Sequence, residues 1–218
     1  MADLKTRIAA RCAKEFNDGD FINLGIGLPT MVADYLPDDI MVTCHSENGF
    51  AGIDVLADES SLDVDIINSG GQYVTALPRA KFFDTAESFG LVRGGHVRAT
   101  VLGAMEVAEN GDLANWIVPG KKVAGMGGAM DLCEGCPEVI ITMLHTQKGA
   151  HKIKPACTLP LTAEKCVTKI ITEMAVMEVT PEGIRVIELH PDFTREEVQE
   201  ATGVKLIWAD DLKPYQED

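Results

Sequence analysis

Residues 40–49 read Ile40-Met41-Val42-Thr43-Cys44-His45-Ser46-Glu47-Asn48-Gly49, and they place a carboxylate where a strand runs into a tight turn. The first five side chains are mostly apolar or β-branched, which is typical of a buried parallel strand. Asn48-Gly49 indicates a turn, because both residue types tolerate positive φ. Glu47 is therefore expected just past the carboxyl end of a strand, in the crevice where open α/β sheets bind their ligands.

Short strand candidates alternate with helical segments along the rest of the chain. Apolar residues recur at helical spacing from Leu4 to Phe16, and a second helix is predicted from Pro29 to Leu36. Thr194-Arg195-Glu196-Glu197 is a capping box, which opens a helix that Gly203 closes. The further strand candidates are residues 21–24, 64–67, 99–102, 139–144, 174–179, 184–189 and 206–208. This alternation predicts an α/β fold with an open, mostly parallel sheet flanked by helices. The lack of linkers and repeats favours a single domain over residues 1–218.

Composition and charge argue against several classes of protein. No apolar stretch approaches the ~20 residues of a membrane helix, and residues 1–16 lack the apolar core of a signal peptide. The formal net charge of −15 disfavours binding to nucleic acid or to a membrane surface. The six cysteines lie mostly within apolar runs, as reduced thiols of a cytosolic protein do. We therefore expect a cytoplasmic protein that binds neither nucleic acid nor membranes.

Two stretches carry a resemblance to a known family. Ser46-Glu47-Asn48-Gly49 resembles the signature of family I coenzyme A transferases, in the subunit that carries the catalytic glutamate. The glycine-rich run from Val123 to Leu132 resembles the loop of the same family that lies against the thioester, and the likeness extends over nearly the whole chain. It is to the beta subunit of the acetate/acetoacetate and butyrate–acetoacetate enzymes of bacteria. The resemblance implies a fold related to ribose-phosphate isomerases and a separate alpha subunit, with the active site at the interface.

The chemistry expected of Glu47 follows from its charge. A carboxylate with an ordinary pKa of about 4.3 is ionised at pH 7 and needs no general base to attack a thioester. CoA would pass from a short-chain acyl-CoA (acetyl-, butyryl- or acetoacetyl-CoA) to a free carboxylic acid through a glutamyl-CoA thioester on Glu47. The thioester energy is conserved throughout, so ATP, a metal and a resident cofactor are not required. Coenzyme A is a substrate in this scheme.

Glycine-rich turns supply the remaining candidate residues. By the resemblance, Gly127 and Gly128 belong to the acyl or thioester pocket, where glycine allows close backbone approach and exposes N–H groups to an oxyanion. Gly25 and Gly27 lie in a turn that resembles the family's βα turn near the active crevice. A dinucleotide fingerprint is rejected there, because its third glycine is missing. Asn48 either orients the carboxylate or donates to an oxyanion, or it is only a turn residue.

Other functions compete with transfer. An acyl-CoA hydrolase would result if water reached the glutamyl anhydride. A sugar-phosphate isomerase is suggested by fold kinship alone, which does not decide function. A non-catalytic scaffold subunit would keep Glu47 for structural reasons only. Cys133-Glu134-Gly135-Cys136 could be a redox pair or half of a zinc site, but its companion ligands are missing and no metal is expected.

Overall fold

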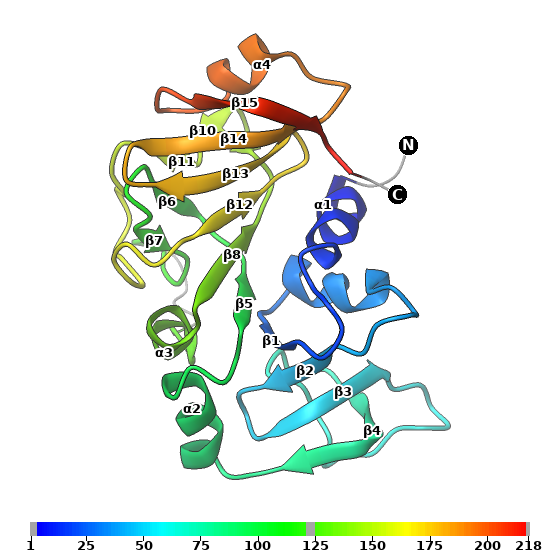
Figure 1. Cartoon of the computed structure of the whole chain (residues 1–218). Coiled ribbons are helices and arrows are strands. Elements are labelled where there is room, and N and C mark those ends of the chain that lie inside the picture. Colours follow the sequence, from blue (N-terminus) through cyan, green and yellow to red (C-terminus); the bar gives the residue numbers. More distant parts are fainter. Residues whose placement is uncertain (1–3, 121–124, 217–218) are drawn as a thin grey trace.

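A computed structural model describes residues 4–120 and 125–216, and its main feature is a ten-stranded sheet with helices on both faces (Figure 1). The strands follow one another in the order β15-β14-β13-β12-β8-β5-β1-β2-β3-β4. In that order their bounds are Ile207–Pro214, Gly183–Leu189, Ala175–Thr180, Lys169–Ile171, Glu138–Thr142, Ala99–Leu102, Phe21–Leu24, Thr43–Ser46, Phe50–Leu56 and Val74–Phe82.

The five central strands β12, β8, β5, β1 and β2 run parallel to one another. Antiparallel strands β3 and β4 extend one end, and antiparallel β13 and β14 extend the other, where β15 pairs parallel with β14. All four side chains of β5 are buried, as expected for a strand covered on both faces. The prediction of an open α/β sheet is confirmed. Because the carboxyl ends of parallel strands share one edge, the loops after the five central strands gather at that edge.

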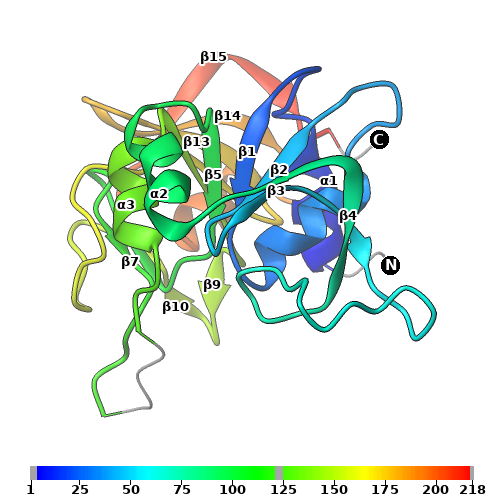
Figure 2. The same cartoon turned by 90° about the horizontal axis from the view of Figure 1, so that it is seen from below.

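Helices cover the two faces unequally. α1 and the 3-10 helix η1 pack on one face with Ile22, Val101 and Ile140, whereas α2, α3 and α4 pack on the other with Val139 and Ile141. Figure 2 shows α2 and α3 on the side opposite α1. The bounds are α1 Leu4–Ala13, η1 Leu28–Tyr35, α2 Thr85–Arg93, α3 Ala129–Gly135 and α4 Arg195–Glu200. Among the described residues, no helix has the length and apolar character needed to span a bilayer.

Two small sheets pack beside the large one. The first has the order β11-β6-β7 and the second pairs β10 with β9. Their bounds are β11 Ile153–Lys154, β6 Glu106–Ala108, β7 Leu113–Ala114, β10 Ala150–His151 and β9 Thr146–Gln147. Buried Val107, Leu113 and Ile153 join them to the core that also holds α2, α3 and α4.

One predicted strand is wrong. Residues 64–67 form a turn, and only Ile67 makes an isolated bridge, to Tyr73. The Asp63 carboxylate accepts the N–H of Asp65 and the Asp63 carbonyl accepts that of Ile66, so local hydrogen bonds replace a sheet ladder. The strand expected from Ile40 also begins later, at Thr43, but Glu47 still follows its last residue directly.

Two helices differ in detail from the predictions. The segment predicted from Pro29 to Leu36 is helical over Leu28–Tyr35 but has 3-10 geometry. Thr194 and Glu197 form the predicted capping box, yet α4 already ends at Glu200 and Gly203 lies beyond it. A Cβ at Gly203 would lie 2.7 Å from the Ile153 carbonyl oxygen, so this glycine permits close packing instead of closing the helix.

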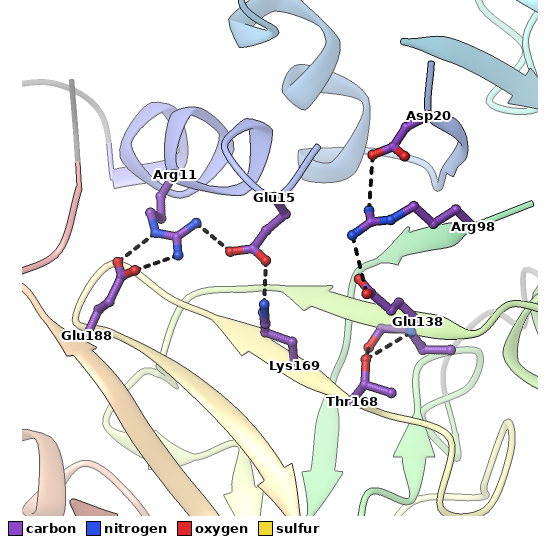
Figure 3. A network of polar contacts seen from close by, with 9 residues as sticks. Arg11, Glu15, Asp20, Arg98, Glu138, Thr168, Lys169 and Glu188 are labelled. Carbon is purple, nitrogen blue, oxygen red and sulfur yellow. Dashed lines mark hydrogen bonds and ion pairs between the residues drawn. The ribbon is translucent and has the colours of Figure 1, made fainter. Parts of the chain in front are cut away.

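A buried ionic network ties α1 to the sheet (Figure 3). The Arg11 guanidinium donates to both oxygens of Glu188 on β14 at 2.7 Å and to Glu15 at 2.6 Å. Lys169 of β12 pairs with the other oxygen of Glu15. The side chains of Arg11 and Glu188 are each only 6% exposed. Desolvation is therefore compensated by two-fold pairing of both Arg11 and Glu15, a geometry in which loss of one partner is costly.

We expect Arg11→Met to lower the free energy of unfolding by about 3–5 kcal/mol, because Glu188 would stay buried without its partner. Urea unfolding at pH 7 measures this change. Arg185→Met is the matched control, since Arg185 is 43% exposed and pairs with Asp211 only at 3.9 Å. Its loss should cost no more than about 1 kcal/mol. Equal effects of the two substitutions would contradict the structural importance of the buried network.

Candidate active site

Glu47 lies in the tight turn that joins β2 to β3. The Gly49 N–H donates to the Ser46 carbonyl at 3.0 Å, and Gly49 has a φ of +140°. A Cβ at Gly49 would lie 2.7 Å from the carbonyl oxygen of Phe83. Glycine is thus required both by the backbone conformation and by the close approach of the chain after β4. The predicted turn is confirmed, and it holds Glu47 at the carboxyl edge of the parallel strands.

One oxygen of the Glu47 carboxylate is held from the neighbouring strand. The side-chain amide of Asn23, at 0% exposure in β1, donates to Oε2 of Glu47 at 3.0 Å and to the His45 carbonyl at 3.2 Å. The hydroxyl of Thr100 on β5 donates to Oδ1 of Asn23 at 3.1 Å and so fixes the orientation of that amide. Within the described residues, Oε1 of Glu47 accepts no hydrogen bond. That oxygen remains available to a substrate.

A second chain of hydrogen bonds fixes the Glu47 backbone. The Ser88 hydroxyl, from α2, donates to the Glu47 carbonyl at 2.9 Å. The same hydroxyl lies 2.9 Å from Nε2 of His45, so Nε2 carries the proton and donates to it. Burial lowers the pKa of His45 to about 4, which keeps the ring neutral at pH 7. His45 therefore supports the turn from below as an uncharged donor.

The glycine-rich loop before α3 comes close to the carboxylate. A Cβ at Gly128 would lie 3.3 Å from Cγ of Glu47 and 2.6 Å from Cζ of Phe89 on α2. Only glycine fits between the aromatic ring and the glutamate. Gly127 is exposed, with a φ of +56°. The structure thus brings Gly128 together with Glu47, while Val123 and Ala124 of the same predicted stretch lie outside the described residues.

The other predicted site residues have different contacts. Gly25 donates to the Val101 carbonyl at 2.8 Å, and a Cβ there would lie 2.9 Å from that oxygen, so it permits tight pairing of β1 with β5. Gly27 has a φ of +88° and precedes η1. The side-chain amide of Asn48 donates to the Ile67 carbonyl at 2.8 Å and does not face the carboxylate.

The Cys133/Cys136 pair lies in the core beneath α3, not at the edge that holds Glu47. Both thiols are buried, and burial raises the pKa of Cys136 to about 12. A hydrogen bond with Cys166, together with burial, raises the pKa of Cys133. Protonated buried thiols are poor metal ligands and poor nucleophiles. Within the described residues, no three His, Cys, Asp or Glu side chains are grouped to hold a metal ion.

Sequence reasoning assigned no role to Asn23, Ser88, Phe89 or Thr100. Asn23 was part of a stretch that resembles the family, but its role depends on the pairing of β1 with its neighbours. The other three lie 41 or more residues from Glu47 in the chain, and no local pattern marks them. Their contribution comes from tertiary contacts alone.

Comparison with known proteins agrees with this site. Residues 5–201 match the coenzyme A transferase family. The beta subunit of acetate CoA-transferase from Escherichia coli (strain K12) is 55% identical over 175 residues, which cover 80% of each chain. The B-type subunit of the probable succinyl-CoA:3-ketoacid coenzyme A transferase from Bacillus subtilis is 45% identical over 203 residues, 93% of this chain and 94% of that protein. Human mitochondrial succinyl-CoA:3-ketoacid coenzyme A transferase 2 is 44% identical over 99% of this chain, which spans 42% of that longer protein.

Solved structures share the fold at low identity. An acyl-CoA transferase from Escherichia coli O157:H7 has a TM-score of 0.76 at 19% identity, over 99% of this chain and 44% of that one. The decarboxylase AibA/AibB has a TM-score of 0.73 at 17% identity, over 100% of this chain and 90% of that one. An α/β sheet of this type thus defines a fold class that serves more than one activity.

The extent of the family match and the identities above 40% decide between these activities. The chain belongs to the coenzyme A transferase family, as the residues around Glu47 predicted. The two bacterial relatives are each named as one lettered subunit of their enzyme, which implies a companion subunit of another type.

Two buried histidines predict a loss of stability in mildly acidic solution. Burial lowers the pKa of both His45 and His145 to about 4, from 6.5 in the exposed side chain. The unfolded chain therefore binds more protons than the folded chain between about pH 6.5 and pH 4. The free energy of unfolding should fall as the pH is lowered through this window, by up to about 1.4 kcal/mol per pH unit for each histidine.

Urea unfolding between pH 7 and pH 4.5 measures this slope. His45→Asn should reduce it by about half, because one of the two linked protons is removed. His96→Asn is the control, since His96 is exposed, and it should keep the full slope. An unchanged slope in the His45 variant would show that His45 does not titrate on unfolding.

Proposed function

We propose that this chain is the glutamate-bearing subunit of a CoA-transferase that moves CoA between a short-chain acyl-CoA and a free carboxylic acid. The observation that carries the proposal is the Glu47 carboxylate, held at one oxygen by Asn23 while the other accepts no hydrogen bond within the described residues. The relatives' names contain acetate, succinyl-CoA and 3-ketoacid, which supports short carboxylic acids as the substrate class. Acetyl-, butyryl- and acetoacetyl-CoA are the donors we expect.

In the first half of the reaction, Oε1 of Glu47 attacks the thioester carbonyl of the acyl-CoA. The C–S bond breaks, CoA leaves as a thiolate, and a mixed anhydride of Glu47 and the acyl group forms. The thiolate then attacks the glutamyl carbonyl and the anhydride C–O bond breaks. The acyl group leaves as a carboxylate, and CoA stays on Glu47 as a thioester.

In the second half, the carboxylate of the acceptor acid attacks the glutamyl-CoA thioester, and the same steps run in reverse. The first product leaves before the second substrate reacts, so the kinetics are ping-pong. Each step exchanges one activated acyl bond for another, which is why no ATP is consumed. Asn23 holds Glu47 in one orientation through both halves, a positioning effect on which reaction geometry depends.

The loop before α3 is suited to stabilise the oxyanions of these steps. The φ of Gly127 is +56° and that of Gly128 is −87°. Successive residues of opposite φ turn their N–H groups toward one side, as in anion-binding nests. Neither N–H donates to another group of the described residues, and Gly128 lies against the side chain of Glu47. We therefore assign both N–H groups to the developing negative charge.

Incubation with acetoacetyl-CoA and no acceptor acid should leave CoA covalently attached to Glu47. The experiment uses the chain assembled with its partner, and intact and peptide mass spectrometry detect the adduct. Borohydride reduction should remove CoA and convert the glutamyl thioester to an alcohol at the same residue. Turnover by the assembled enzyme without any trapped adduct would favour a hydrolase or another route.

Glu47→Asp keeps the charge but withdraws the carboxylate by one methylene from its place beside Gly128. We expect kcat to fall by about 100-fold or more, because reaction geometry tolerates little displacement. Glu182→Asp, at an exposed turn, is the matched control and should leave kcat unchanged. Assembly should be intact in both variants. Near-normal turnover by Glu47→Asp would contradict the nucleophile assignment and leave the scaffold interpretation standing.

A further inference from the structure

A cavity of about 410 Å³ lies next to the site but does not include Glu47. It opens between η1, β3 and residues 68–74, and much of its lining is apolar, including Leu24, Met31 and Ile53. Its lip is formed by Ile26, Val55 and Leu56, which are 66%, 60% and 62% exposed. Apolar side chains this exposed around a concave surface are typical of a protein interface.

The connection from β3 to β4, residues 57–73, extends this surface; we call this segment the arm (Figure 2). Asn68, Ser69, Gly70 and Gln72 of the arm line the cavity. The arm also exposes large apolar side chains that contribute little to the core of this chain, namely Leu62, Val64, Ile67 and Tyr73. The cavity and the arm thus form one apolar surface at the carboxyl edge of the sheet.

The charges on this surface all have one sign. The sequence contains no Lys or Arg from Glu15 to Pro78. Asp34 and Asp54 line the cavity. The arm adds four further carboxylates, Asp58, Glu59, Asp63 and Asp65. Such a field repels carboxylic acids and the phosphates of CoA, so the cavity is unsuited to the substrates of the proposed reaction. It favours an occupant with apolar side chains bordered by Lys or Arg.

The arm is coupled directly to the catalytic turn. The Ser69 N–H donates to the hydroxyl of Ser46 at 2.9 Å, and the Asn48 amide donates to the Ile67 carbonyl at 2.8 Å. Ser46 and Asn48 are the two neighbours of Glu47 in the chain. Any protein that seats on the arm therefore contacts the segment that holds Glu47 from both sides.

We propose that the partner subunit docks on the arm and inserts an apolar side chain, flanked by Lys or Arg, into the cavity. This rests on the two-subunit transferase proposed above, and it locates the face of this chain that meets the second subunit. The human relative contains the matching segment within a much longer chain, so there the same surface would pack against the rest of that chain. A second copy of this chain is a poorer occupant, since it would bring its own carboxylates against Asp34 and Asp54.

The test measures binding of the purified chain to its cognate alpha subunit, with Kd by biolayer interferometry and mass by light scattering. Leu56→Lys, at the lip of the cavity, should weaken assembly at least 10-fold, as should the charge reversal Asp54→Lys. Ile207→Lys is the matched control, because Ile207 is an exposed apolar residue on β15 at the far end of the sheet. Circular dichroism and urea unfolding of each isolated variant confirm that it folds. Raising the salt concentration should weaken wild-type assembly and have less effect on Asp54→Lys.

The outcomes separate this inference from the function on which it rests. Weaker assembly for Leu56→Lys and Asp54→Lys, with Ile207→Lys unchanged, supports the docking surface. Normal assembly of both lip variants overturns it but leaves the two-subunit transferase intact. Self-association of the chain that Leu56→Lys abolishes, without binding to the alpha subunit, would assign the surface to a second copy and overturn the proposal. Full CoA transfer by the isolated chain would overturn the two-subunit function itself.

Discussion

The pairing of β1 between β2 and β5 is the constraint on which the site depends. Parallel register places Asn23 of β1 opposite His45 on one side and Thr100 on the other. One amide side chain can then accept from Thr100 and donate to Glu47 with no freedom to flip. A shift of β1 by a single residue would turn Asn23 to the opposite face and leave Glu47 without this donor.

The second half of the site depends on close packing between α2 and α3. A Cβ at Gly135 would lie 2.6 Å from the Val92 carbonyl oxygen, so glycine allows the two helices to touch backbone to backbone. That contact brings Gly128, just before α3, against Phe89 of α2 and against Glu47. Ser88 of α2 meanwhile holds the Glu47 carbonyl. One helix pair thus supplies both a backbone contact for the reacting group and an anchor for its turn.

Charge is distributed differently on the two ends of the sheet. On the side of α1, the carboxylates of Glu15 and Glu188 are buried and paired with Arg11 and Lys169. At the arm, the carboxylates are exposed and Lys and Arg are absent from the surrounding sequence. The paired charges hold a helix on the sheet, whereas the unbalanced ones create a field that reaches into solvent. The same residue type therefore serves cohesion within the chain at one end and, in our proposal, recognition of a partner at the other.

Local chemistry in the sequence determined the turn at Glu47, the capping box at Thr194, most central strands and the family to which the chain belongs. Each of these depends on residues adjacent in the chain, whose φ preferences and hydrogen bonds act without distant partners. Residues 64–67 have strand composition but form a turn, because Asp63 offers nearer hydrogen bonds than any strand does. The partners of Glu47 were decided by tertiary structure only: Asn23, Ser88 and Gly128 reach it through strand register and helix packing, which pair residues far apart in sequence.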